Sequence, residues 1–149
     1  MGLIINQQLD IPAKAIFDQL ELEYNDGCGN SLIFDGGPVQ RDRGFILHRT
    51  CDKQWESTVA IADDISLTAS KDILSDIAVG NGPADAMITL GYSSWESGQL
   101  EQELVQNSWL TIPADSAIIF HTDCAKRAGA AASSIGVNLE MLALDAGHA

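Results

Sequence analysis

Three strand-like segments follow one another in this sequence without a helix between them, and this arrangement limits the folds open to the chain. Residues 44–49 are largely apolar, and residues 57–61 and 65–68 have the pattern of a hairpin that turns at Asp63-Asp64. Because helical segments occur elsewhere, neighbouring strands of this kind are not expected in a purely parallel sheet. The sequence therefore predicts an α+β fold with a mixed sheet, in a single domain over residues 1–149.

The beginning of the chain predicts a strand followed by a helix. Residues 2–6 are apolar and β-branched, which is typical of a buried strand. Asp10 can cap the following helix, and Pro12 suits the first helical turn, where its missing N–H costs little. The apolar stripe expected to face the core consists of Ile16, Phe17 and Leu20.

The middle of the chain alternates between turns and short regular elements. Residues 25–31 are rich in turn-forming side chains, and residues 32–34 predict a short strand. A short helix is expected next to the hairpin, ending at residues 80–83, and residues 86–90 predict another strand. The apolar side chains of that helix are Ile73, Leu74 and Ile77.

Two helices and one strand are predicted in the last third of the chain. Ser97 can cap a helix over residues 98–106. Residues 117–121 are expected to form a strand, and Asp123 can cap an alanine-rich helix that ends at Gly136. In the first of these helices, the side chains expected toward the core are Leu100, Leu104 and Val105, and those expected toward solvent are Glu101 and Glu103.

The charge of the chain argues against direct binding to DNA. The net charge is −13, and only eight Lys and Arg residues are present to neutralise phosphates. Arg41, Arg43, Arg49 and Lys53 lie close in sequence and can gather locally, but the overall field repels a duplex. Apolar runs such as residues 117–120 are far shorter than the roughly 18 residues of a membrane span. A cytoplasmic protein with no membrane contact is expected.

The cysteines and histidines suggest neither a disulfide framework nor a metal site. Cys28, Cys51 and Cys124 are odd in number and widely spaced, so free thiols are the simplest interpretation. Cys124 lies at a predicted helix start, which favours the thiolate, but the neighbouring Asp123 opposes it. No metal or cofactor is therefore predicted, and no catalytic residue is assigned.

One candidate binding element is the sequence Gly36-Gly37-Pro38, which follows a predicted strand. Glycines at such a point can adopt positive φ, and their backbone N–H groups can cradle an anion. A phosphate loop normally leads straight into a helix, whereas this chain continues toward a strand. A purely structural turn is therefore the alternative interpretation.

A second candidate comprises Asp42, Arg43 and His48. The charged pair lies at the entrance of the predicted strand, and His48 shares a face with Ile46 by the two-residue period. Arg43 can clamp a carboxylate or phosphate with its planar fork. The alternative is an internal Arg–Asp bridge that holds the glycine loop, with His48 as a hydrogen-bonded structural residue.

A third candidate comprises Tyr92, Trp95 and Gln99, in the connection between a strand and a helix. Ligand contacts often come from such connections at the ends of sheets. Trp95 provides a flat stacking surface and Gln99 an amide, a combination suited to a partner loop or a planar ligand. A tryptophan that only fills the underside of its own loop is the alternative.

Two segments, residues 34–48 and residues 90–110, together resemble the AlgH/YqgE-like family of bacterial proteins, and the resemblance extends from residues 2–6 to residues 146–149. The resemblance implies a bent, bifurcated sheet that forms a pseudo-barrel, with helices packed outside. Family members often bear the label of transcriptional regulator, although their biochemistry is undefined. They usually carry roughly thirty more residues upstream, within the size of one domain. The chain is thus expected to be an N-terminally truncated domain.

The sequence leaves three functions open. The first is a non-enzymatic module that binds a protein or a small ligand through the two segments. The second is a transcriptional regulator, acting directly or through a protein partner. The third is a hydrolase or redox enzyme that uses His48 or Cys124, although no G-x-S-x-G or HExxH pattern is present. An edge left open by a missing strand also predicts a homodimer.

Overall fold

The computed structural model describes residues 1–145, which form two compact units, residues 1–94 and the described residues from 95 onward. The two units are described separately below. The last part of the family resemblance, residues 146–149, lies outside the described residues. Within the described part, no helix is long and apolar enough to span a bilayer.

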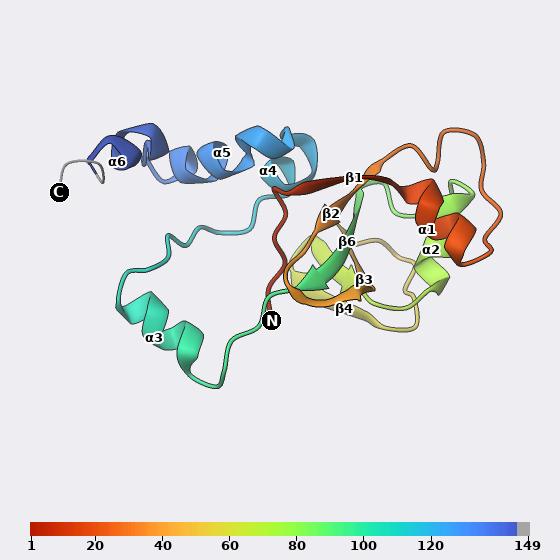
Figure 1. Ribbon diagram of the computed structural model, residues 1–149, viewed down its shortest axis with the longest axis horizontal. Helices are drawn as coiled ribbons and strands as arrows, with labels where there is room; N and C mark the ends of the chain where they lie inside the picture. Colours follow the sequence, from red (N-terminus) through yellow and green to blue (C-terminus); the bar gives the residue numbers. More distant parts are fainter. Residues whose placement is uncertain (146–149) are drawn as a thin grey trace. The chain divides into compact units, whose positions relative to one another are not determined.

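The first unit contains a six-stranded mixed sheet in the order β1-β2-β6-β3-β5-β4 (Figure 1). Strands β2 and β6 are parallel, and each of the other neighbouring pairs is antiparallel. The strands are β1 (Gln8–Pro12), β2 (Leu32–Asp35), β3 (Val39–Arg49), β4 (Thr58–Ala62), β5 (Ile65–Thr68) and β6 (Ala86–Tyr92). The predicted α+β class and mixed sheet are confirmed.

The sheet is open, so the expected closure into a pseudo-barrel is wrong. Strands β1 and β4 form its two edges and do not pair with each other. Strand β4 precedes β5 in the predicted hairpin, and a register irregularity between Ala60 and Ala62 leaves Ile61 as an extra residue. Such a bulge is one way in which proteins discourage pairing at a sheet edge. The homodimer through an open edge stays a prediction.

Two short helices, α1 (Ala13–Gln19) and α2 (Asp72–Ala78), contact each other and pack on one face of this sheet (Figure 1). Phe17 and Ile73 are completely buried, as the predicted apolar stripes require. They join side chains from three neighbouring strands in one core. The strand residues of that core are Ile33, Ile46 and Ile88.

The start of the chain differs from its prediction. Residues 2–6 form no strand, and only Gly2 makes an isolated bridge, with Ser93. The first strand begins later, at Gln8, so Asp10 lies inside β1 and does not cap α1. Pro12 is the N-cap residue of α1 and makes no side-chain capping bond. The apolar run was mistaken for a strand because short runs of this kind lack a diagnostic period.

The second unit is helical in the described part of the chain (Figure 1). Residues 117–121, predicted as a strand, are helical instead, because Asp115 caps the segment. Its Oδ1 atom accepts hydrogen bonds from the N–H groups of Ala117 (2.8 Å) and Ile118 (3.3 Å). The helices are α3 (Gln99–Val105), α4 (Ser116–His121), the 3₁₀ turn η1 (Cys124–Lys126), α5 (Arg127–Ser134) and α6 (Leu139–Asp145).

Helix α3 was predicted in the right place but with the wrong surroundings. Its N-cap is Gly98 in a left-handed conformation, with no side-chain capping bond, so Ser97 does not cap it. No residue of the helix is buried, and Val105, expected toward the core, is 83% exposed. Asp123 likewise makes no side-chain capping bond, although the alanine-rich helix after it does end before Gly136, which has positive φ.

The core of the first unit contains a hydrogen-bonded histidine. The Nδ1–H group of His48 donates to the carbonyl of Arg49 (2.8 Å), so its Nε2 accepts from the hydroxyl of Thr68 (2.9 Å). That hydroxyl accepts in turn from Thr58 (2.8 Å), which receives the N–H of Trp55 (3.0 Å). Burial lowers the pKa of His48 from the ordinary value of 6.5, although the hydrogen bond to the carbonyl of Arg49 opposes this shift, so the neutral ring that accepts from Thr68 is favoured.

The turn between β2 and β3 lies directly against β6. A Cβ atom on Gly37 would overlap the backbone of Tyr92, and a Cβ atom on Gly91 would overlap the carbonyl oxygen of Gly37. Both glycines also have positive φ, at 148° and 74°. The glycines therefore allow two backbones to approach within contact distance.

Replacing Gly91 with alanine is expected to destabilise the protein strongly. The methyl group meets two obstacles, the left-handed conformation, which costs about 1–2 kcal/mol, and the carbonyl of Gly37. Gly27→Ala is the matched control, because Gly27 has φ +90° with no atom within 4 Å of the added Cβ. Urea unfolding should show a loss for Gly91→Ala that exceeds the control by at least about 1 kcal/mol. Equal losses of unfolding free energy in the two variants would show that the close approach of the two backbones does not contribute to stability.

The buried histidine should make stability depend on pH. Because the pKa of His48 is lower in the folded protein than in the unfolded chain, the unfolded chain binds more protons below about pH 6.5. The free energy of unfolding should thus fall as the pH decreases from about 6.5. His48→Gln, which keeps a donor and an acceptor, should flatten this dependence between about pH 7 and 5. Unfolding measured across that range in both proteins tests the assignment; parallel curves would contradict it.

Candidate functional site

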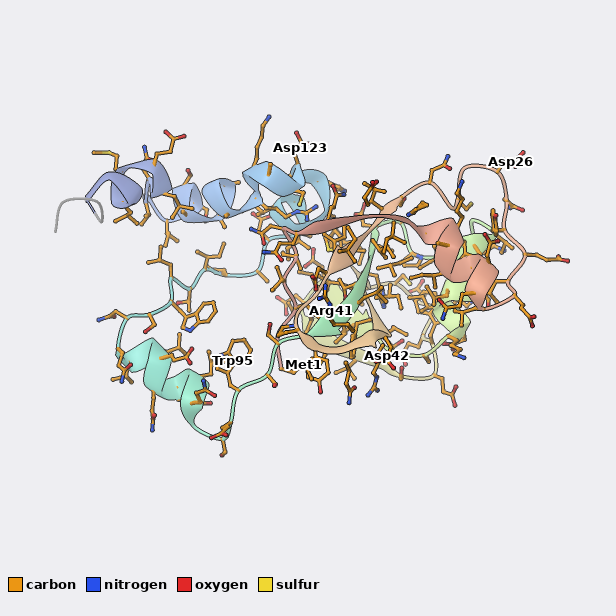
Figure 2. All side chains as sticks on the ribbon, in the orientation of Figure 1. Met1, Asp26, Arg41, Asp42, Trp95 and Asp123 are labelled. Atoms are coloured by element: carbon orange, nitrogen blue, oxygen red, sulfur yellow. The ribbon has the colours of Figure 1, made fainter. Side chains whose placement is uncertain are left out.

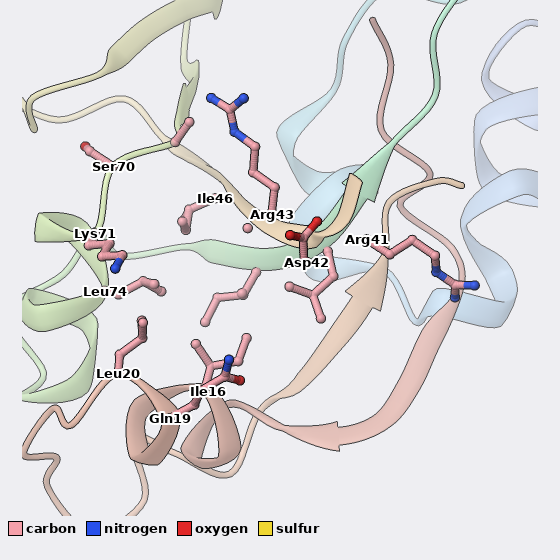
Figure 3. Close-up of a pocket in the computed structure, with 14 residues that line it drawn as sticks. Ile16, Gln19, Leu20, Arg41, Asp42, Arg43, Ile46, Ser70, Lys71 and Leu74 are labelled. Carbon is pink, nitrogen blue, oxygen red and sulfur yellow. The ribbon is translucent and has the colours of Figure 1, made fainter. Parts of the chain in front are cut away.

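The first unit contains a pocket of about 490 Å³ between its helices and the sheet (Figure 3). Its walls are the last turn of α1, the segment that leads into α2, and strands β3 and β6. The floor is apolar because the stripes of both helices turn toward the sheet here. The apolar side chains that line the pocket are Ile16, Leu20, Ile46, Leu74, Ile88 and Leu90.

The mouth of the pocket is formed by an irregular stretch of β3. Val39 pairs with Tyr92 and Gly44 pairs with Leu90, so residues 40–43 together lie opposite Gly91 alone. A bulge of this kind bends a strand and redirects its side chains. Asp42 and Arg43 were expected at a strand entrance, and they lie in this bulge, just before regular pairing resumes at Gly44.

Charged and polar side chains lie around this mouth. Arg41, Asp42 and Arg43 come from the bulge, Lys71 precedes α2, and Gln19 belongs to the end of α1. Three of the eight basic residues of a chain with net charge −13 thus line one pocket. In Figure 3 the two arginine side chains extend away from the apolar floor, whereas Lys71 lies beside the floor residue Leu74.

Arg41 is held by an ion pair that the sequence analysis did not identify. Its Nη2 atom lies 2.6 Å from Oδ2 of Asp35, at the end of β2. The other oxygen of Asp35 accepts the N–H of Gly37 (3.3 Å). An internal Arg–Asp bridge at the glycine turn therefore exists, but Arg41 and Asp35 form it in place of Arg43 and Asp42. Only its position beside the charged motif pointed to Arg41.

Arg43 lies over an aromatic ring in this structure. Its guanidinium carbon lies 5.3 Å from the centroid of Phe45, two residues along the same strand. The ring of Phe45 meets Tyr92 edge to face at 5.6 Å. Tyr92 is thereby part of the packing around β3 and does not line the pocket.

The other predicted site residues of the first unit also lie outside the pocket lining. Gly36 and Gly37 bring the turn against β6, with Pro38 between them and β3. His48 is 1% exposed within the core network and meets Trp55 edge to face. The structure thus brings together Asp42 and Arg43 with residues that sequence reasoning missed, namely Gln19, Arg41 and Lys71.

In the second unit, the predicted residues Trp95 and Gln99 meet a carboxylate. Oε2 of Glu103 accepts the indole N–H groups of Trp95 (3.1 Å) and Trp109 (2.7 Å), while its Oε1 accepts from the amide of Gln99 (3.0 Å). The two indole rings meet edge to face at 5.9 Å. Figure 2 shows Trp95 beside α3. Glu103 is therefore not directed into solvent as the sequence analysis expected.

These bonds favour the charged form of Glu103. The hydrogen bond from Trp109 lowers the pKa of Glu103 most, burial opposes this shift, and the bonds from Trp95 and Gln99 lower the pKa further. Gln99 and Glu103 lie four residues apart in α3, a spacing that could have indicated their contact, whereas Trp95 precedes the helix.

The three cysteines are free thiols in the described structure. Cys124 lies in the short turn η1. Among residues 1–145, no three His, Cys, Asp or Glu side chains are arranged to hold a metal ion.

Comparisons with known proteins agree with one another. The model of the AlgH-like family matches residues 1–140. A UPF0301 protein of Azoarcus sp. (strain BH72) is 47% identical over all of this chain and 79% of its own length. Another, from Saccharophagus degradans, is 46% identical over all of this chain and 73% of its own length.

Solved structures share the fold. The solution structure of the AlgH protein from Pseudomonas aeruginosa is 42% identical, with a TM-score of 0.77 over all of this chain and 79% of that protein. A protein from Corynebacterium diphtheriae, only 13% identical, shares the fold with a TM-score of 0.58 over 85% of this chain and 68% of that protein. The family match and the identities of more than 40% over the whole chain show that this protein belongs to the AlgH-like family.

Proposed function

We propose that this protein is a non-enzymatic binding module whose pocket accommodates a small amphipathic anion. The observation that carries the proposal is an apolar floor with a basic mouth, in a chain that is otherwise strongly acidic. Arg43 and Lys71 outweigh Asp42 by one positive charge, and the charge of Arg41 is compensated by its ion pair with Asp35. An anion drawn to this protein is therefore attracted to the mouth and repelled from most of the remaining surface.

The size and lining of the pocket suit an organic ligand with two distinct ends. A cavity of about 490 Å³ lies within the range of small-molecule sites, about 300–1,000 Å³. The floor removes an alkyl or ring group from water, which contributes about 0.8 kcal/mol for each CH₂ group buried. The head group then lies at the mouth, where Lys71 is the cation nearest the floor (Figure 3).

The bulge in β3 gives the mouth its selectivity. Asp42 lies beside the basic residues, so a head group with several negative charges meets one repulsive carboxylate. A single carboxylate or phosphate ester on an apolar body satisfies this arrangement better than a polyanion. Gly44 adds no side chain to the wall, which leaves room for the ligand beside the strand.

The regulator and enzyme functions gain less support from the described residues. The core network encloses His48, and Cys124 is not among the residues that line the pocket. A transcriptional role through a protein partner is compatible with ligand binding, because a bound small molecule can bias such an interaction. A regulator or an enzyme would bind its small molecule in the same pocket.

Octanoate is a suitable first probe, with 1-octanol as its uncharged counterpart. Titration calorimetry and amide chemical shifts should show octanoate binding at the pocket, and weaker binding of 1-octanol. Lys71→Gln should weaken octanoate binding about fivefold, because an exposed ion pair contributes up to about 1 kcal/mol. Lys14→Gln, which removes the same charge from an exposed position outside the lining, should leave the affinity unchanged.

A second variant tests the floor. Gly44→Leu places a side chain on the wall of the pocket, where a Cβ atom meets only the carbonyl oxygen of Thr89 at 3.9 Å. Octanoate binding should be lost while the thermal unfolding temperature stays within a few degrees. If neither octanoate nor octanol perturbs pocket residues, the proposed function is wrong. Equal binding of the two probes, unaffected by Lys71→Gln, would contradict the anionic head group.

A further inference from the structure

The charge at the mouth of the pocket depends on a residue that does not line it. Asp35 ends strand β2, and its Oδ2 atom lies 2.6 Å from Nη2 of Arg41. Arg41 lines the pocket, whereas Asp35 does not. With this ion pair formed, the other charged residues of the lining are two cations, Arg43 and Lys71, and one carboxylate, Asp42. They leave one net positive charge for a ligand.

Asp35 has a fixed position beside the wall of the pocket. Its backbone pairs with Leu90 of β6, a residue of the pocket lining, and its N–H group donates to the carbonyl of Gln7 (2.9 Å). Its second carboxylate oxygen, Oδ1, accepts the N–H of Gly37 (3.3 Å). The side chain is 22% exposed, and both of its oxygens have partners. The carboxylate therefore holds Arg41 from a position that the sheet determines.

The guanidinium group of Arg41 is a cation that the ion pair withholds from the ligand. Its side chain is 61% exposed, and Figure 3 shows it extending away from Lys71 and Leu74. An arginine side chain is long and flexible, so its release from Asp35 supplies a second cation to a head group at the mouth. A ligand that recruits Arg41 has to break the pair, which reduces the affinity by up to about fivefold.

We propose that Asp35 is a positioning residue that determines the charge of the ligand, which presupposes that the pocket binds the amphipathic anion proposed above. By holding Arg41 it restricts the pocket to a head group with a single negative charge. One carboxylate neutralises the net positive charge of the mouth. A head group with two carboxylates leaves the second one uncompensated beside Asp42, unless Arg41 leaves Asp35.

A purely structural role of the ion pair is the alternative. In that case the loss of the Asp35 carboxylate would weaken the binding of singly and doubly charged ligands alike. The proposal requires instead that the preference between the two ligands changes. The ratio of the two affinities therefore distinguishes these roles.

Two ligands that differ in head-group charge provide the test. Hexylmalonate is octanoate with a second carboxylate on the carbon next to the first. At about pH 8 both ligands are fully ionised, because carboxyl pKa values lie far lower. Calorimetry on the whole chain should show that the parent protein binds octanoate more tightly than hexylmalonate.

Asp35→Asn is the test variant, because it removes the charge of the carboxylate but keeps an oxygen that can accept the N–H of Gly37. It should bind hexylmalonate about fivefold more tightly than the parent does, while the affinity for octanoate changes less than about twofold. Thermal unfolding verifies that the variant is folded. If it is not, Asp35→Ser replaces it, since a serine hydroxyl can accept the same N–H.

Three control variants isolate the role of the pair. Asp26→Asn removes an exposed carboxylate outside the lining and should change the affinity for hexylmalonate less than about twofold. Asp35→Glu keeps the negative charge and should keep the preference of the parent. The double variant Asp35→Asn/Arg41→Gln removes both charges of the pair, so the gain in hexylmalonate affinity should disappear.

The results separate this inference from the proposed function of the pocket. If octanoate binds to the parent but Asp35→Asn does not bind hexylmalonate more tightly, the inference alone is wrong. It is also wrong if the gain persists in the double variant, or if Asp26→Asn shows an equal gain. If octanoate does not bind to the parent at all, the proposed function fails and the inference fails with it.

Discussion

The contact between the β2–β3 turn and strand β6 is the constraint on which the first unit depends. Gly37 and Gly91 let the two backbones meet where any side chain would collide. Because β6 turns at Gly91 with positive φ, four residues of β3 bulge out opposite it. That bulge carries Arg41, Asp42 and Arg43 at the pocket mouth. The position of these charges therefore follows from the geometry of the sheet at Gly91.

The pocket exists because two short helices cover the sheet only partly. Helices α1 and α2 have seven residues each and are too short to be stable alone. Their stability comes from burying Phe17 and Ile73 against the strands. Beyond their ends, the floor of the sheet stays accessible under a charged rim. In the same unit the buried His48 donates to the carbonyl of Arg49 and accepts from Thr68. Thr68 accepts from Thr58, and Thr58 accepts the N–H of Trp55.

The sequence predicted most of the elements of the first unit, since hairpins and turn-bounded strands carry strong local signals. It did less well where an apolar run was short. Residues 117–121 form a helix because Asp115 caps them, and residues 2–6 make only a bridge. Of the candidate site, Asp42 and Arg43 were identified from their motif. Lys71 and Gln19 were missed, because only folding brings their elements beside β3.

By itself the sequence determined the α+β class, the mixed sheet and the acidic charge, because these follow from local periodicity, turn residues and composition. The resemblance of residues 34–48 and 90–110 to known proteins indicated the family. Tertiary structure decided that the sheet stays open, because β1 and β4 lie at opposite edges. It also decided that Arg41 pairs with Asp35 and that Glu103 joins two tryptophans. Such pairings depend on which strands and turns meet in space, and no spacing along the chain specifies that.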